Sequence, residues 1–111
     1  MKDNKMIAEF MQLPTEIFQP RGIINYGRDD SWYEEHELSY HLSWSWLMDV
    51  VDKIECTPID NDDNSDNFFN VMIEVFECNI NGGDICICEN GHTKREATYK
   101  AVVKFINQLN K

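Results

Sequence analysis

The sequence has no run of apolar residues long enough to cross a membrane, because a spanning helix needs about twenty of them and every apolar run here is far shorter. The N-terminal segment MKDNKMIAEFMQL also lacks the clean apolar core and the small-residue cleavage site of a secretory signal. These absences predict a cytoplasmic protein that does not associate with membranes. A length of 111 residues suits a single domain, residues 1–111, since two separate cores would each be too small to be stable.

Basic residues are scarce. Ten Lys and Arg stand against twenty Asp and Glu, for a formal net charge of −10. So acidic a chain repels phosphate backbones, which argues against direct binding of nucleic acid. The acids gather over residues 29–37 and 60–66, whereas residues 92–111 carry five bases and one acid. Charge runs of this kind are typical of solvated surface, and they also fit contact between the basic end and an acidic surface of a partner or a second copy.

Signatures of enzymatic chemistry are also missing. The sequence has no glycine-rich phosphate loop, no Gly-x-Ser-x-Gly elbow and no His-Glu-x-x-His motif. Gly82 and Gly83 belong to a predicted turn, because neither the trailing helix nor the lysine of a phosphate loop follows them. No catalytic residue and no cofactor is assigned, and an enzyme is the less favoured class.

Three amphipathic helix patterns are present. Apolar residues recur at spacings of three and four over about residues 4–13, 43–55 and 94–110. Asp3 or Asn4 is suited to cap the first helix and Ser43 the second. Thr93 and Glu96 form the pattern of a capping box, which predicts the start of the third helix.

The periodicity changes to that of strands between the second and third helices. A β-hairpin is expected over about 68–89, with its turn at residues 81–84, because Asn and Gly tolerate the backbone angles of tight turns. The apolar residues stand at odd positions up to Val75 and at even positions from Phe76. This switch indicates a bulge or a strand buried on both faces. An edge strand is expected within residues 31–40. Together with the helices, these strands predict one α+β domain.

The return strand of this hairpin is apolar at both parities. Ile85 and Ile87 point to one face and Cys86 and Cys88 to the other, so both faces of the sheet are expected to be covered.

Three segments carry a resemblance to a known family: residues 4–11 (NKMIAEFM), 40–55 (YHLSWSWLMDVVDKIE) and 96–106 (EATYKAVVKFI). In this order and at this spacing they resemble the phage ABA sandwich domain, a family of small proteins from bacteriophages, prophages and related mobile elements. The resemblance implies a small α/β/α sandwich, with helices packed on an antiparallel sheet built on the hairpin. It implies no reaction, and no functional residue is carried over from it.

The cysteines and histidines raise the question of a metal site. Zinc usually takes its ligands from C-x₂₋₄-C knuckles, whereas an extended strand would hold Cys86 and Cys88 about 7 Å apart. Packing as small apolar side chains is therefore favoured, and Cys86, Cys88 and His92 are only weak metal candidates. His36 and His41, which have several glutamates nearby, are weak metal or acid–base candidates for which a structural role is favoured. For His41, just before the second helix, the expected role is a hydrogen bond at the start of that helix.

The acidic loop over residues 60–66 matches a calcium-binding EF-hand only in part. Counted from Asp63, Phe68 replaces the required glycine and Glu74 falls within the predicted hairpin, so no calcium site is expected.

Aromatic and basic side chains point to protein binding. Trp44 and Trp46 lie two residues apart, so a helix directs them about 200° away from each other. If one faces the core, the other is left for an interface, where tryptophan is a common anchor. Lys100 and Lys104 line the outside of the third helix and are the matching basic candidates.

The leading hypothesis is a non-enzymatic accessory protein of a phage or mobile element that binds another protein or itself, a homodimer being one form. The alternatives are a small metal- or ligand-dependent enzyme and an acidic DNA mimic that inhibits a nucleic-acid-binding host protein.

Overall fold

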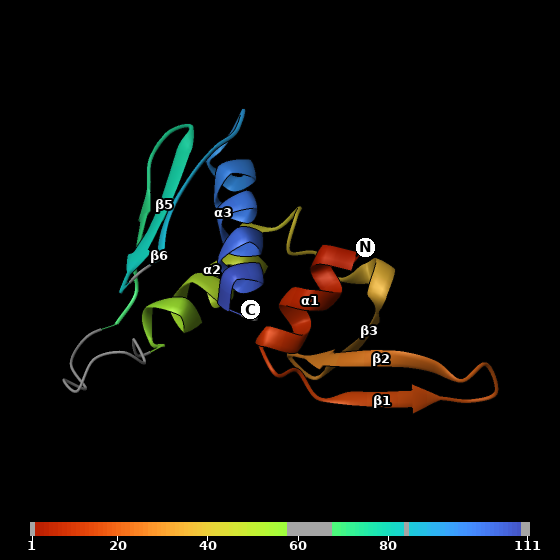
Figure 1. The fold of residues 1–111 in the computed structure, drawn as a ribbon. Coiled ribbons are helices and arrows are strands. Elements are labelled where there is room, and N and C mark those ends of the chain that lie inside the picture. Colours follow the sequence, from red (N-terminus) through yellow and green to blue (C-terminus); the bar gives the residue numbers. More distant parts are fainter. Residues whose placement is uncertain (1, 58–67, 84, 110–111) are drawn as a thin grey trace.

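The computed structural model describes residues 2–57, 68–83 and 85–109 (Figure 1). These residues form helices α1 (Lys2–Phe10), α2 (Trp44–Glu55) and α3 (Lys94–Leu109), and two antiparallel three-stranded sheets. The predicted α+β sandwich, with its three helices and its antiparallel hairpin, is confirmed. Within the described ranges, no helix has both the length and the apolar character that a membrane span requires.

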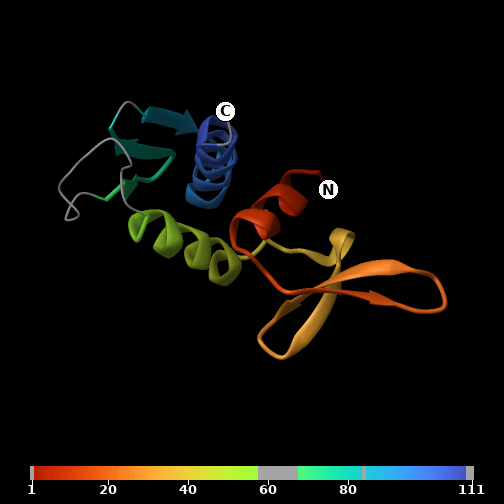
Figure 2. The ribbon, with the colours of Figure 1, turned by 60° about the horizontal axis from the view of Figure 1, so that its bottom comes forward.

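The two sheets lie on opposite sides of the helices (Figures 1 and 2). The first joins, in this order, β1 (Thr15–Phe18), β2 (Ile23–Arg28) and β3 (Ser31–Glu34), and a short 3₁₀ helix, η1 (Glu35–Glu37), follows it. The second joins β4 (Asn70–Ile73), β5 (Glu77–Gly82) and β6 (Ile85–Asn90).

The caps of α2 and α3 are those that the sequence predicts. The Ser43 hydroxyl accepts a hydrogen bond from the Trp46 backbone N–H at 3.5 Å. The Thr93 hydroxyl accepts one from the Glu96 backbone N–H at 3.0 Å. Each cap satisfies a first-turn N–H that has no partner within its helix.

The predicted cap of α1 is wrong. The helix begins at Lys2, so Asp3 and Asn4 lie inside its first turn. Asn4 is fully buried, and its amide nitrogen donates to the Leu38 carbonyl at 2.8 Å and lies 2.8 Å from Nδ1 of His41. Its amide oxygen accepts a hydrogen bond from the Tyr99 hydroxyl at 2.8 Å. Asn4 is therefore a tertiary link between α1, the segment before α2, and α3, and not a cap.

Only one face of the second sheet is covered within the described part of the chain. Ile80 and Ile87 pair across β5 and β6 and are buried against the helices, while Cys86 and Cys88 on the opposite face are exposed. The prediction that both faces are covered is wrong, because α2 and α3 both contact the same sheet from one side.

The parity switch near Val75 marks neither a bulge nor a two-sided strand, so that prediction is also wrong. The chain turns between β4 and β5, where the Glu74 N–H donates to the Glu77 carbonyl at 2.8 Å. The switch in parity follows because the two apolar runs belong to two different strands. Val71 pairs with Ile80, and the side chains of both face the helices.

The first sheet projects away from the helices (Figure 2). All four residues of β1 are exposed, and the radius of gyration is 14.9 Å, against about 13 Å for a compact domain of this length. The expected edge strand within residues 31–40 covers only Ser31–Glu34, after which the chain turns into η1.

Candidate functional site

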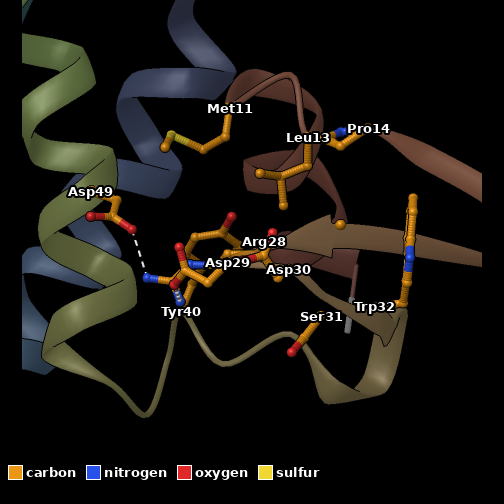
Figure 3. Close-up of a pocket in the computed structure, with 11 residues that line it drawn as sticks. Met11, Leu13, Pro14, Arg28, Asp29, Asp30, Ser31, Trp32, Tyr40 and Asp49 are labelled. Carbon is orange, nitrogen blue, oxygen red and sulfur yellow. Dashed lines mark hydrogen bonds and ion pairs between the residues drawn. The ribbon is translucent and has the colours of Figure 1, made fainter.

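A cavity of about 660 Å³ lies where the connection from α1 to β1, the turn from β2 to β3, and α2 come together. Figure 3 shows Trp32 and Asp49 on opposite sides of it, with Arg28 and Tyr40 between them. Its lining is formed by Met11, Leu13, Pro14, Gly27, Arg28, Asp29, Asp30, Ser31, Trp32, Tyr40 and Asp49.

The turn between β2 and β3 places two carboxylates at this cavity. Asp29 and Asp30 connect the paired residues Arg28 and Ser31 and have positive φ angles of 51° and 67°. Two-residue hairpin turns require such angles, and aspartate tolerates them better than most side chains. The turn therefore fixes both acids beside the arginine that precedes them.

Arg28 links the first sheet to α2. Its Nη2 lies 2.6 Å from Oδ2 of Asp49 and its Nη1 lies 2.8 Å from Oδ2 of Asp29. Its guanidinium carbon stands 4.2 Å from the centre of the Trp46 ring. The Arg28 side chain is only 12% exposed, but the side chains of Asp29 and Asp49 are 75% and 50% exposed, so water still screens both ion pairs.

Tyr40 brings an unpaired polar group to the cavity. It is 1% exposed, and its ring packs edge-to-face on Trp46 with 5.1 Å between ring centres. Among the described residues its buried hydroxyl has no hydrogen-bond partner. Burial raises the pKa of Tyr40 to about 12, so the hydroxyl stays neutral at physiological pH.

Trp32 approaches the backbone closely. A Cβ on Gly27 would lie 3.0 Å from Cγ of Pro14 and 3.2 Å from the Trp32 ring, so only glycine leaves this contact unstrained. The ring is 40% exposed and meets Phe18 edge-to-face at 5.7 Å. It therefore belongs both to the cavity and to the open surface of the first sheet.

The first sheet exposes apolar side chains on both of its faces. Ile17 and Ile24 pair across β1 and β2 on one face, and Phe18 and Trp32 meet on the other. We call Phe18 and Trp32 the hairpin patch. Large exposed apolar groups in contact with each other are typical of interaction surfaces.

The two tryptophans singled out from the sequence do point apart. Trp46 is buried against Tyr33, Tyr40 and Arg28, whereas Trp44 at the start of α2 is 37% exposed. Trp46 is thus a core residue that orients the cavity lining, and Trp44 is open to contact.

Lys100 and Lys104 both have counter-ions within the chain. Nζ of Lys100 lies 3.2 Å from a Glu96 carboxylate oxygen, and Nζ of Lys104 lies 3.2 Å from one of Glu89. With Tyr99 they line a hollow of about 390 Å³ along α3. These partners neutralise much of the positive charge that the sequence places on this helix.

Of the weak metal candidates, His36 lies in a cluster of potential ligands, whereas Cys86, Cys88 and His92 do not among the described residues. Within the described ranges, one group of three potential ligands has its atoms within 4.8 Å of one another, and it consists of Glu34, His36 and Glu37, with no cysteine. The Cys88 thiol donates to the Glu77 carboxylate at 3.0 Å, and this hydrogen bond raises the pKa of the thiol. The acidic loop of residues 60–66 lies outside the described residues.

The structure gives His41 a different role from the one expected at the start of α2. Its ring Nδ1 lies 2.8 Å from the amide nitrogen of Asn4 in α1, so it forms part of the buried link between helices.

No pattern in the sequence marks Arg28 or Tyr40 as a site residue, and Asp29 and Asp30 stand out there only as part of an acidic run. One local signal was available, since two acids between short apolar stretches fit a two-residue hairpin turn.

Comparisons with protein-family models, curated proteins and solved structures found no match to this chain. The resemblance to the phage ABA sandwich domain therefore stays a prediction.

Proposed function

We propose that this chain acts by binding another protein through the hairpin patch, as a non-enzymatic cytoplasmic accessory protein of a phage or mobile element. The observation that carries the proposal is the contact between Phe18 and Trp32, both 40% exposed, on a sheet that projects from the helices. Aromatic side chains of this kind commonly anchor protein interfaces. The assignment to phages or mobile elements rests on the sequence resemblance.

The charges around the hairpin patch define the partner. Glu16 and Glu34 flank Asn25 in register, and strand alternation places them on the same face as Phe18 and Trp32. Arg21 lines the hollow beside Phe18 and Glu34, so the two acids outnumber one base here. A surface with an apolar centre and a mainly basic rim complements this face. A second copy of the chain fits less well, because each copy carries a formal charge of −10.

A photocrosslinking residue in place of Glu16 tests the proposal inside bacterial cells. We expect one discrete adduct, whose partner is identified by mass spectrometry and then purified for affinity measurement. Phe18→Ser combined with Trp32→Ser should remove the adduct and weaken binding at least about tenfold, since buried aromatic anchors contribute about 2 kcal/mol or more.

The matched control replaces two other exposed apolar residues, Val75 and Phe76, each 60% exposed in the turn between β4 and β5. Serine at both positions should leave the adduct and the affinity unchanged. Equal loss in both double variants would contradict a specific patch. The same crosslinking residue is also placed at Trp44 and at Lys100. An adduct from either of these positions with none from position 16 would place the interface on α2 or α3 and overturn the proposal.

A further inference from the structure

We propose that the cavity beside Arg28 is a binding site for an organic cation, an alkylammonium or guanidinium group. Its volume of about 660 Å³ falls within the range of small-molecule sites, which combine apolar walls with a few polar groups. Leu13, Pro14 and Trp32 supply the apolar part here, and Arg28, Asp30 and Tyr40 the polar part.

The balance of charge selects a cation. Three carboxylates line the cavity, those of Asp29, Asp30 and Asp49, against the one guanidinium of Arg28. Asp29 and Asp49 already hold that guanidinium at 2.8 and 2.6 Å, so its charge is compensated before any ligand arrives. An anion would meet two uncompensated negative charges, whereas an ammonium group would be attracted by them.

Two acceptors remain for the N–H groups of such a ligand. The Tyr40 hydroxyl is buried and unpartnered among the described residues, which is the arrangement expected of a group that a ligand satisfies. The Asp30 carboxylate is exposed at the turn, outside the ion pairs of Arg28. The Trp32 ring adds an aromatic wall, and a cation is attracted to the face of such a ring.

The cation has two possible sources. One is a free amine or guanidine compound, and the other is a Lys or Arg side chain of a protein. Trp32 belongs to both the cavity and the hairpin patch, so a protein seated on the patch would have the cavity within reach of its side chains. The cavity chemistry itself does not depend on what the hairpin patch binds.

The test compares three five-carbon probes that differ only in the end group: n-pentylammonium, 1-pentanol and pentanoate. Each is titrated into the purified chain while the backbone amide resonances of Gly27 to Ser31 are followed by NMR. We expect pentylammonium to shift these resonances saturably, with binding at least about tenfold tighter than for the alcohol or the acid. Equal binding of 1-pentanol would reduce the site to an apolar hollow, and tighter binding of pentanoate would make it an anion site; either result overturns the proposal.

Two variants locate the binding energy. Asp30→Asn keeps a residue that tolerates the left-handed backbone at φ 67° and should weaken pentylammonium binding about threefold. Tyr40→Phe should weaken it about threefold to tenfold, as expected for the loss of one hydrogen bond. Asp52→Asn on the exposed side of α2 removes the same charge away from the cavity and should change nothing. Equal effects of Asp30→Asn and Asp52→Asn would show that the net charge of the chain attracts the probe and that the cavity does not select it. That result would overturn the proposal.

A lysine derivative blocked at both backbone ends, Nα-acetyl-lysine methylamide, separates the two sources. Binding tighter than that of pentylammonium assigns the site to a protein side chain, and binding of pentylammonium alone assigns it to a free amine. Absence of binding by either probe, with the fold intact by NMR, overturns the proposal. Because the hairpin patch is tested through Phe18 and Trp32 with its own partner, its failure and the failure of the cation site are separate results.

Discussion

The replacement Tyr40→Phe is expected to stabilise the protein. The Tyr40 hydroxyl is buried without a hydrogen-bond partner among the described residues, and an unsatisfied buried polar group costs about 1–3 kcal/mol. Phenylalanine keeps the ring and its edge-to-face contact with Trp46 at 5.1 Å. Because the hydroxyl borders a cavity rather than a packed core, we expect the lower end of that range, a gain of about 1 kcal/mol in the free energy of unfolding.

Tyr99→Phe is the matched control, because the same atom is removed from a hydroxyl that does have a partner. The Tyr99 hydroxyl donates to the buried amide oxygen of Asn4 at 2.8 Å, so its loss should cost about 1 kcal/mol or more. Urea unfolding of both variants at neutral pH measures the two effects, provided that the dependence on urea is unchanged. If Tyr40→Phe destabilises the protein as much as Tyr99→Phe does, the Tyr40 hydroxyl is hydrogen-bonded in the folded state, and the reasoning about the cavity is refuted.

Three further predictions concern pH, an ion pair and a glycine. Burial raises the pKa of Tyr40 from 10.0 to about 12, so the unfolded chain loses this proton first, and Tyr40 should lower the free energy of unfolding by about 2 kcal/mol between pH 10 and 12. Burial also raises the pKa of Tyr99 to about 12, so urea unfolding across this range should show a smaller fall for Tyr40→Phe rather than none. Arg28→Ala removes two ion pairs and the contact with Trp46 and should cost about 2 kcal/mol, measured by thermal unfolding. Gly91→Ala would place a Cβ 2.7 Å from the backbone nitrogen of Ala97 and should cost about 1–3 kcal/mol by the same measurement.

Controls for these predictions lie elsewhere in the chain. Arg21→Ala at the exposed end of the first sheet should change stability by less than about 0.5 kcal/mol, so an equal effect at Arg28 would contradict the role of its ion pairs. Gly22 has no atom within 4 Å of an added Cβ, so Gly22→Asn should be milder than Gly91→Ala. A pH dependence identical in Tyr40→Phe and the unchanged protein would show that Tyr40 does not titrate as described.

The features that sequence predicts well here are local ones. Ser43 and Thr93 bond backbone N–H groups three residues away, so a short stretch of chain contains both the cap and its partner. Asn4 looks like a cap by the same rule, yet its partners Leu38 and Tyr99 lie 34 and 95 residues away. No local pattern shows that such a tertiary bond replaces the capping role.

The first sheet and the cavity depend on contacts that the linear pattern does not show. Strands β1 and β3 have four residues each, and their apolar side chains are largely exposed, so the burial pattern that identifies a strand is absent. The cavity joins residues near 11–14, 27–32, 40 and 49. The cysteines of β6 show the opposite error, because here an apolar pattern predicts burial that does not occur. Cys86 and Cys88 predict a layer over their face of the second sheet, and within the described ranges this face is open.

The bond between Asn4 and Tyr99 also joins two residues that are added to the chain far apart in time. Tyr99 is added to the chain 95 residues after Asn4, on the order of ten seconds later at ordinary translation rates. Until then the hydrogen bond between the Tyr99 hydroxyl and the Asn4 amide oxygen cannot form. This link between α1 and α3 is thus completed only after α3 has been made.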